Sequence, residues 1–204
     1  MKKHLSFLGA LLAAGLLAAP AYAADSTTYV SGDVGVSSFS NIKPSGAIGN
    51  ESTNVGINVM GAVGMKFDNW RAEAELGYQR NNAHQFTDNT GAVTPSTGNI
   101  SVTSVLANGY YDFNNGGVDP YLTAGLGWAS AGLNNVVMPA GTFNESHSAF
   151  AYQFGVGVDV PVTKSLAVDA RYRYFRTGNF SLNNVRKDIH VASNSVLVGL
   201  KVGF

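Results

Sequence analysis

Apolar and polar residues alternate with a period of two along much of this chain, and this pattern predicts β-strands. The last nine residues show it clearly. Val196, Val198, Leu200, Val202 and Phe204 are apolar, and the residues between them are mostly small or polar. Each such strand therefore has one apolar face and one wetter face.

The alternation returns in eight segments, which turn-forming or polar stretches separate. The predicted strands are residues 27–39, 54–67, 70–80, 100–113, 120–131, 148–160, 166–176 and the C-terminal stretch 196–204. Short turns are expected at 68–69, 114–117 and 161–164, and long polar loops at 40–53, 81–99, 132–147 and 177–187. Short and long connections thus alternate along the chain.

Alternating short turns and long loops are typical of outer-membrane barrels, and eight is their smallest common number of strands. Strands of about ten residues or more match a tilted crossing of the hydrocarbon layer. A closed barrel also leaves no unpaired strand edge in lipid. We therefore predict an all-β fold, an eight-stranded antiparallel transmembrane β-barrel with short periplasmic turns and long extracellular loops.

Two soluble folds share part of this pattern. A soluble sandwich alternates too, but its exposed face is charged, whereas the non-apolar face here holds few charges and many glycines. A soluble lipocalin-like barrel lines its cavity with apolar residues, whereas here the apolar faces carry large aromatic residues and the other faces are polar. Both comparisons favour the membrane barrel.

The N-terminus predicts an export signal. Lys2 and Lys3 precede an apolar run over residues 5–19, and Ala21-Tyr22-Ala23 fits a cleavage site. We expect residues 1–23 to be a cleaved signal peptide and residues 24–204 to form one barrel domain. This domain is expected in the outer membrane of a Gram-negative bacterium.

Composition narrows the function further. The chain has 13 basic and 13 acidic residues, so removal of Lys2 and Lys3 leaves a small acidic excess, which does not favour nucleic-acid binding. It has no cysteine, which excludes disulfides and thiolate metal sites. After the signal, no run approaches the roughly 20 apolar residues of a membrane helix. Any membrane crossing must then be made by strands.

If the apolar faces meet lipid, the opposite faces place charges in the lumen. The inward charged set is Asp33, Lys66, Arg71, Glu73, Glu75, Asp112, Asp159, Asp169, Arg171, Arg173 and Lys201. An eight-stranded barrel is only wide enough to be filled by side chains, so opposite charges there should pair. We predict a structural lumen network that includes Lys66, Arg71, Glu73, Glu75, Asp169, Arg171, Arg173 and Lys201. The alternative reading is an ion or proton path.

Within this network, Glu73 with Glu75 and Arg171 with Arg173 each share a strand face. A carboxylate–guanidinium ladder between the two pairs is expected.

Aromatic residues near the strand ends predict two interfacial belts. One belt is Phe67, Trp70, Tyr111, Phe113 and Phe204, at the short-turn end; the other is Tyr78, Trp128, Phe150, Tyr152 and Tyr174.

Candidate catalytic and metal-binding residues do not form a motif. His84, His147 and His190 have no ligand spacing, so no metal or cofactor is expected. His190 and Ser193 resemble part of a hydrolase site, but an odd separation in one strand points them to opposite faces. We therefore predict no catalytic residues and no enzyme activity.

Several stretches resemble the opacity-type and outer-membrane-protein-A-like β-barrel proteins. They are Asp119-Pro-Tyr-Leu-Thr-Ala-Gly-Leu-Gly127, Phe154-Gly-Val-Gly-Val158, Leu166-Ala-Val-Asp-Ala-Arg-Tyr-Arg-Tyr174 and Val196-Leu-Val-Gly-Leu-Lys-Val-Gly-Phe204. The resemblance covers the mature chain and implies insertion by the barrel assembly machinery, for which Phe204 would be the assembly signal.

The expected function is a structural or surface-interaction role, of the adhesin or antigen type, in which the outer loops meet a host or surface ligand. Outer-membrane lipid and lipopolysaccharide are the other expected partners. A small porin-like channel is the alternative, and a lipid-modifying hydrolase of the outer membrane is a further one.

Overall fold

A computed structural model describes residues 26–40, 49–88, 93–95, 97–113, 117–138, 141–178, 180–182 and 185–204. The predicted signal peptide at 1–23 lies outside these residues. Across the described ranges, no helix has the length and apolarity needed to span a membrane.

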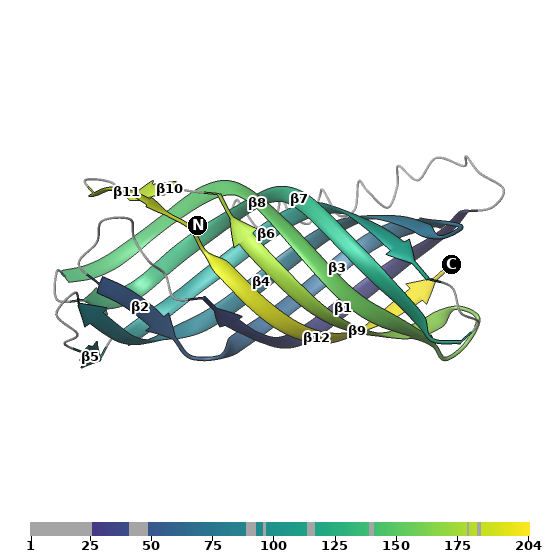
Figure 1. Ribbon diagram of the computed structural model, residues 1–204, viewed down its shortest axis with the longest axis horizontal. Coiled ribbons are helices and arrows are strands. Elements are labelled where there is room, and N and C mark those ends of the chain that lie inside the picture. The colour runs from purple at the N-terminus through teal and green to yellow at the C-terminus, as the bar shows by residue number, and fades with distance from the viewer. Residues whose placement is uncertain are drawn as a thin grey trace.

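Eight long strands form the wall of a closed barrel (Figure 1). They are β1 (Ser26–Phe39), β3 (Gly56–Phe67), β4 (Trp70–Asp88), β6 (Thr97–Asp112), β7 (Asp119–Met138), β8 (Gly141–Pro161), β9 (Leu166–Thr177) and β12 (Ala192–Gly203). Every neighbouring pair is antiparallel, and the pairing of β1 with β12 closes the ring. The predicted fold, an eight-stranded antiparallel barrel, is confirmed.

Side-chain burial follows the period of two. On β6, Leu106 and Tyr110 are each 2% exposed, whereas Val105, which directly precedes Leu106, is 45% exposed. Val34 and Val198 face each other across β1 and β12, and both are exposed. Large apolar residues thus cover the outside, and mostly polar residues fill the inside.

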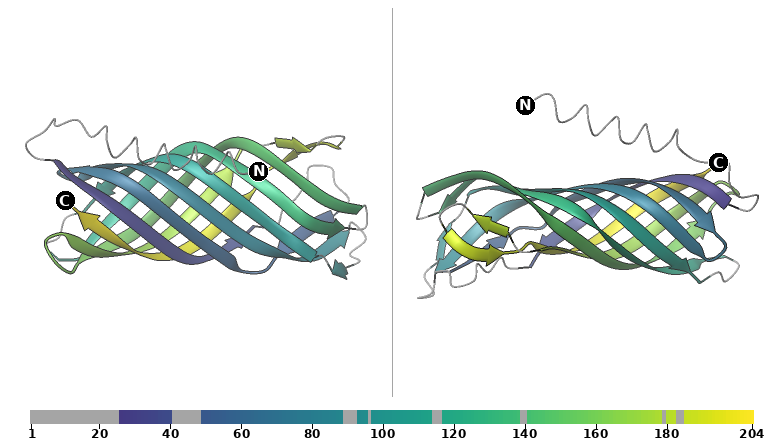
Figure 2. Two further views of the ribbon diagram at one scale, coloured as in Figure 1. Left: turned by 180° about the vertical axis from the view of Figure 1, so that it is seen from behind. Right: turned by 90° about the horizontal axis from the view of Figure 1, so that it is seen from above.

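The two ends of the barrel differ (Figure 2). At one end the strands join through short turns, such as Asp68–Asn69, where Asp68 adopts a positive φ of 51°, a conformation that aspartate tolerates better than most residues. At the other end the wall extends into additional strands. β2 (Gly49–Thr53) and β5 (Val93–Pro95) pair with β4, and β10 (Phe180–Leu182) pairs with β11 (Val185–Ile189).

The long connections were predicted as loops throughout, and for residues 81–99 and 132–147 this is wrong. β4 continues to Asp88, β6 begins at Thr97, and β7 and β8 pair as far as Met138 and Gly141. The predicted loops at 40–53 and 177–187 likewise contain β2, β10 and β11. Strands beyond the lipid have water on both faces, so they need no apolar alternation, and backbone pairing alone supports them.

Candidate functional site

The barrel lumen holds the candidate site, because it collects the charged side chains that the sequence places on inward positions. Lys66, Arg71, Glu73, Glu75, Asp169, Arg171, Arg173 and Lys201 all lie on the inward side of their strands. Most are buried, and the side chain of Lys66 is 35% exposed at the short-turn end. The structure distributes them over several layers along the barrel axis.

The layer nearest the short turns is built on two aspartates. The Arg71 guanidinium lies 2.8 Å from an Asp112 carboxylate oxygen and 3.2 Å from one of Asp159. Lys66 pairs with Asp112 at 3.0 Å, and Lys201 pairs with Asp159 at 2.5 Å. These five residues also line a hollow of about 260 Å³ that opens at this end. Two carboxylates thus share three cations.

Three tyrosines surround the Arg71 guanidinium. Its Cζ atom lies 5.9, 4.4 and 4.8 Å from the ring centroids of Tyr29, Tyr110 and Tyr121. Tyr29 and Tyr110 donate hydrogen bonds to the two carboxylate oxygens of Glu73, at 2.8 and 2.5 Å. The sequence analysis missed Tyr29 and Tyr110. Strand alternation could have found them, since Tyr29 lies four residues from the inward Asp33 and Tyr110 lies two residues from the inward Asp112.

The middle layer is centred on Arg171. Its guanidinium lies 2.9 Å from Asp33, 3.6 Å from Glu75 and 3.8 Å from Asp169. Arg173 lies 3.4 Å from Glu75. The ladder expected between two glutamates and two arginines is therefore formed at Glu75 only, because tyrosine hydroxyls occupy Glu73 instead.

Amide and hydroxyl side chains surround the buried Glu75–Arg173 pair. Gln153 accepts a hydrogen bond from Arg173 Nε and donates to Glu75 at 3.1 Å and to Asn108 at 2.7 Å. Asn108 in turn donates to Glu75 at 2.9 Å. Other buried hydrogen bonds in the lumen are Asn58 to Ser195, Ser37 to Asn81 and Ser193 to Gln79. The predicted lumen network contained charged residues only, so these neutral groups were not part of it.

An apolar cluster fills the lumen toward the end with the extended strands. Its members are Phe39, Ile100, Val102, Leu106, Ala129, Ala131, Ala151, Phe175 and Val191, all buried. The Phe175 ring lies 4.7 Å from the Arg173 guanidinium carbon, so the apolar cluster and the polar network are in contact. The sequence analysis did not predict this cluster, because inward positions were expected to be polar.

The residues considered for catalysis occupy different surroundings. Ser193 is fully buried in the lumen, where its hydroxyl donates to Gln79 at 3.0 Å. His190 precedes β12 and is partly exposed, so strand alternation does not relate it to Ser193 as the sequence analysis assumed. Over the described ranges, no group of three or more histidine or acidic side chains is arranged to hold a metal ion.

Aromatic residues cluster at both ends of the outward surface. Near the short turns, the Trp70 and Tyr111 rings lie 4.9 Å apart, and the Tyr111 and Phe113 rings lie 5.0 Å apart. Toward the other end, Trp128 and Phe150 form a cross-strand pair at 6.5 Å. Phe204 is exposed, and its backbone N–H donates to the carbonyl of Thr28. Its role as an assembly signal stays a prediction.

Comparison with known proteins agrees with this architecture. The sequence model of the family described as "Outer membrane protein beta-barrel domain" matches residues 9–204. Outer membrane protein PagN of Salmonella typhimurium is 33% identical over an alignment of 121 residues, and the match covers 52% of this chain and 51% of PagN. The chain thus aligns with about half the length of this curated relative.

Neisserial surface protein A is a solved structure with the same fold. Neisserial surface protein A matches 87% of this chain and 97% of its own, with a TM-score of 0.59 and 22% identity. Ail, the attachment invasion locus protein of Yersinia pestis, matches 85% of this chain and 97% of its own, with a TM-score of 0.46 and 18% identity.

Proposed function

The chain belongs to the family of outer membrane protein β-barrel domains, and from this membership we propose that it acts in surface interaction through its extended outer end. The barrel lies in the outer membrane of a Gram-negative bacterium. In this family the short turns face the periplasm and the long connections face outward. The extended strands therefore belong to the cell surface.

The observation that carries the proposal is the continuation of the wall beyond the outer aromatic pair. Trp128 and Phe150 mark the interface, and the pairing of β7 with β8 continues past them from Ser130 and Ser148 to Met138 and Gly141. A paired hairpin costs less entropy to order on binding than a free loop. It is therefore a suitable scaffold for contact with a host or surface ligand.

The filled lumen supports the same proposal and disfavours a porin-like channel. Ion pairs and hydrogen bonds connect the inward side chains of the charged layers, and the apolar cluster lies beyond them. We propose that this network is a structural plug. We also propose that the protein has no enzymatic role, since the Ser193 hydroxyl is engaged with Gln79 inside the lumen.

The proposal is tested by shortening the outer hairpins at paired residues. Asn82 pairs with Asn99, and Ala131 pairs with His147, so residues 83–98 and 132–146 are each replaced by Asn-Gly, which favours a two-residue hairpin turn. Cells that produce the shortened barrel are expected to adhere to cultured epithelial cells no better than cells without the protein. The heat-modifiable mobility of the folded barrel should be retained.

A matched control changes the opposite end. Replacement of Asp68–Asn69 by Asn-Gly leaves the outer hairpins intact, so adherence should equal that of the unaltered protein. Adherence that persists in the shortened, folded barrel would place the interacting surface elsewhere. An unaltered protein that fails to raise adherence at all would argue against the surface-interaction role itself.

A further inference from the structure

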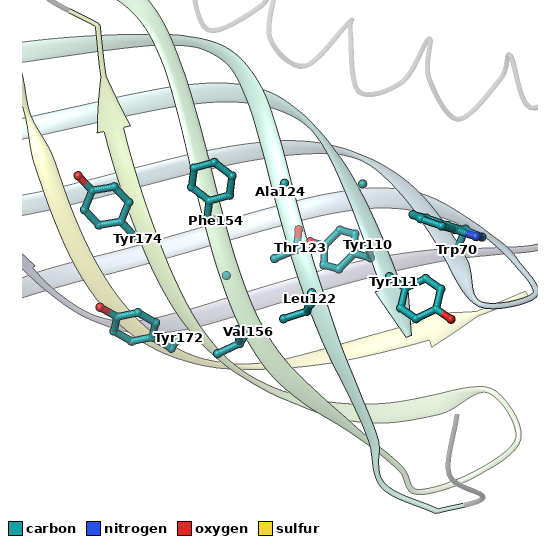
Figure 3. A pocket seen from close by; sticks show the side chains of 12 residues that line it. Trp70, Tyr110, Tyr111, Leu122, Thr123, Ala124, Phe154, Val156, Tyr172 and Tyr174 are labelled. Carbon is teal, nitrogen blue, oxygen red and sulfur yellow. The ribbon is translucent and has the colours of Figure 1, made fainter. Parts of the chain in front are cut away.

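The outward face of the barrel has a hollow over β6, β7, β8 and β9, with Trp70 of β4 at its edge. Figure 3 shows this hollow, which has a volume of about 560 Å³. Large side chains surround it, namely Trp70, Tyr111, Leu122, Phe154, Tyr172 and Tyr174. It lies on the lipid-facing side, apart from the lumen and from the outer hairpins.

Small residues make the floor of the hollow. Gly109 and Ala124 are directly paired across β6 and β7, and Ala124 is paired with Phe154 on β8. A Cβ added to Gly109 would have no atom within 4 Å, so the space above it is open. The neighbouring side chains of Leu122 and Phe154 project from the wall and are 50% and 56% exposed. The small residues Gly109 and Ala124 therefore lie lower than the surrounding large side chains.

The hollow begins at the periplasmic side of the membrane. Trp70 follows the short turn Asp68–Asn69, and its ring packs edge-on against Tyr111. Tryptophan and tyrosine at this position mark the interface with lipid headgroups. The hollow extends from this belt toward Phe154 and Tyr174, so it runs into the hydrocarbon layer (Figure 3).

The size of the hollow decides between two occupants, a second copy of the chain and a lipid. Stable protein interfaces use about 20–30 residues on each side, and 12 residues line this hollow. Its volume instead falls in the range of about 300–1,000 Å³ found for small-molecule sites. Nearly all of the lining is apolar or aromatic, which matches a hydrocarbon chain.

We propose that this hollow is a lipid site that holds one acyl chain of a phospholipid from the periplasmic leaflet. The chain lies over Gly109 and Ala124, and the headgroup lies beside Trp70 and Tyr111. Since lipid tails are as apolar as the wall, the selectivity comes from van der Waals packing in the concave surface. The proposal rests on membership of the outer-membrane family and is independent of the adhesion proposed above.

The first test counts phospholipid that stays bound when the folded barrel is released from detergent micelles in native mass spectrometry. The probe is 1-palmitoyl-2-oleoylphosphatidylethanolamine, and the filling variant is Gly109→Leu. The matched control is Gly32→Leu, since Gly32 also has no atom within 4 Å of an added Cβ. The unaltered protein and Gly32→Leu should retain one lipid per barrel. Gly109→Leu should retain at most about one third of that amount.

The second measurement locates the lipid. Trp70 and Trp128 are the two tryptophans of the chain, so Trp128→Phe leaves a reporter at the hollow, and Trp70→Phe leaves one at the opposite belt. Phosphatidylethanolamine with brominated acyl chains, added to the micelles, should quench Trp70 more strongly than Trp128. The Gly109→Leu change in the Trp128→Phe background should remove the difference.

Each other outcome overturns the proposal. Equal lipid retention in all three proteins, or equal quenching of the two tryptophans, would mean that the hollow does not select an acyl chain. A dimer that Gly109→Leu abolishes and Gly32→Leu preserves would make a second copy the occupant. If Gly109→Leu fails to show the heat-modifiable mobility of a folded barrel, Ala124→Leu fills the same floor and replaces it.

Discussion

Arg173 is buried in the lumen, and its environment there depends on Glu75. Glu75 lies 3.4 Å from Arg173 and 3.6 Å from Arg171, whereas Arg171 also pairs with Asp33 and Asp169. Loss of Glu75 would therefore leave Arg173 buried without its carboxylate. Loss of Arg173 would leave Glu75 still paired with Arg171. The two partners of one ion pair thus have unequal importance.

This asymmetry predicts a ranking of stabilities. Glu75→Gln should lower the free energy of unfolding by about 3–5 kcal/mol, the usual cost of leaving one partner of a buried pair unpaired. Arg173→Met should cost about 1–3 kcal/mol. The double variant should be more stable than Glu75→Gln alone. Urea unfolding of the refolded barrel in micelles measures all three, and a larger loss for Arg173→Met would contradict the assignment of partners.

Glycine at position 64 makes room for a tyrosine. A Cβ added to Gly64 would lie 2.4 Å from Cζ of Tyr29, 2.6 Å from its hydroxyl and 2.7 Å from Cγ of Glu73. Gly64→Ala should therefore displace Tyr29 from Glu73 and cost about 1–3 kcal/mol of unfolding free energy. Gly32→Ala is the control, since an added Cβ there meets nothing within 4 Å. Equal stability of the two variants in the same urea assay would show that Tyr29 does not depend on Gly64.

At the residue scale, the sequence predicts the face of a side chain better than its partner. Alternation along β4 and β9 was sufficient to place Glu73, Glu75, Arg171 and Arg173 inside. It could not show that Glu73 bonds to Tyr29 and Tyr110. Partners across the lumen depend on the tilt of the strands and on the stagger between them, which no single strand contains.

At the scale of elements, the paired extensions of β7 and β8 are the main difference from the sequence prediction. Residues 132–133 and 136–138 are paired with β8 as far as Gly141, and a register shift separates the two groups. We expect the backbone amides of these residues to exchange hydrogen at least about tenfold more slowly than in an unstructured peptide, because each opening must break the hairpin pairing. Hydrogen–deuterium exchange of the refolded barrel measures this. Exchange at the unstructured rate would restore the loop prediction for residues 132–147.

The membrane-spanning strands were predictable because lipid imposes a simple rule on them. Every second residue of β3 and β9 must be apolar where it meets hydrocarbon, so the strand boundaries at Phe67 and Leu166 were found to within a residue. Water imposes no such rule on the outer extensions. β6 begins at Thr97 and β7 ends at Met138, and the parts of these strands outside the lipid lack the apolar alternation that would have predicted them.

At the scale of the molecule, closure could be predicted and the composition of the lumen only in part. A sheet of eight strands with one apolar face must close into a barrel in lipid, because the backbone groups of an open edge would have no hydrogen-bond partner there. The charged layers followed from the same alternation. The apolar cluster around Ile100 and Phe175 did not, because inward apolar residues and outward apolar residues have the same appearance in a sequence.

Two kinds of side-chain layer, one polar and one apolar, thus follow one another along the lumen. The polar layer is held by contacts such as Glu75 with Arg173, and the apolar layer contains Phe39 and Phe175. An eight-stranded barrel leaves space only for side chains, and an apolar constriction excludes water and ions. We expect no stable conductance in planar bilayers from the unaltered protein. Opening one layer alone should not change this, because the other layer still fills the lumen.

The prediction is checked with three folded variants. Arg71→Ser, Glu75→Ser and Arg173→Ser together open the polar layers, Phe39→Ser with Phe175→Ser opens the apolar layer, and only the combination of all five should conduct. Heat-modifiable mobility confirms folding in each case. Current through the polar-layer variant alone would show that the apolar cluster is not a barrier. Stable current through the unaltered protein would favour the porin-like alternative, because ions would then pass layers that the ion pairs and the apolar cluster are expected to close.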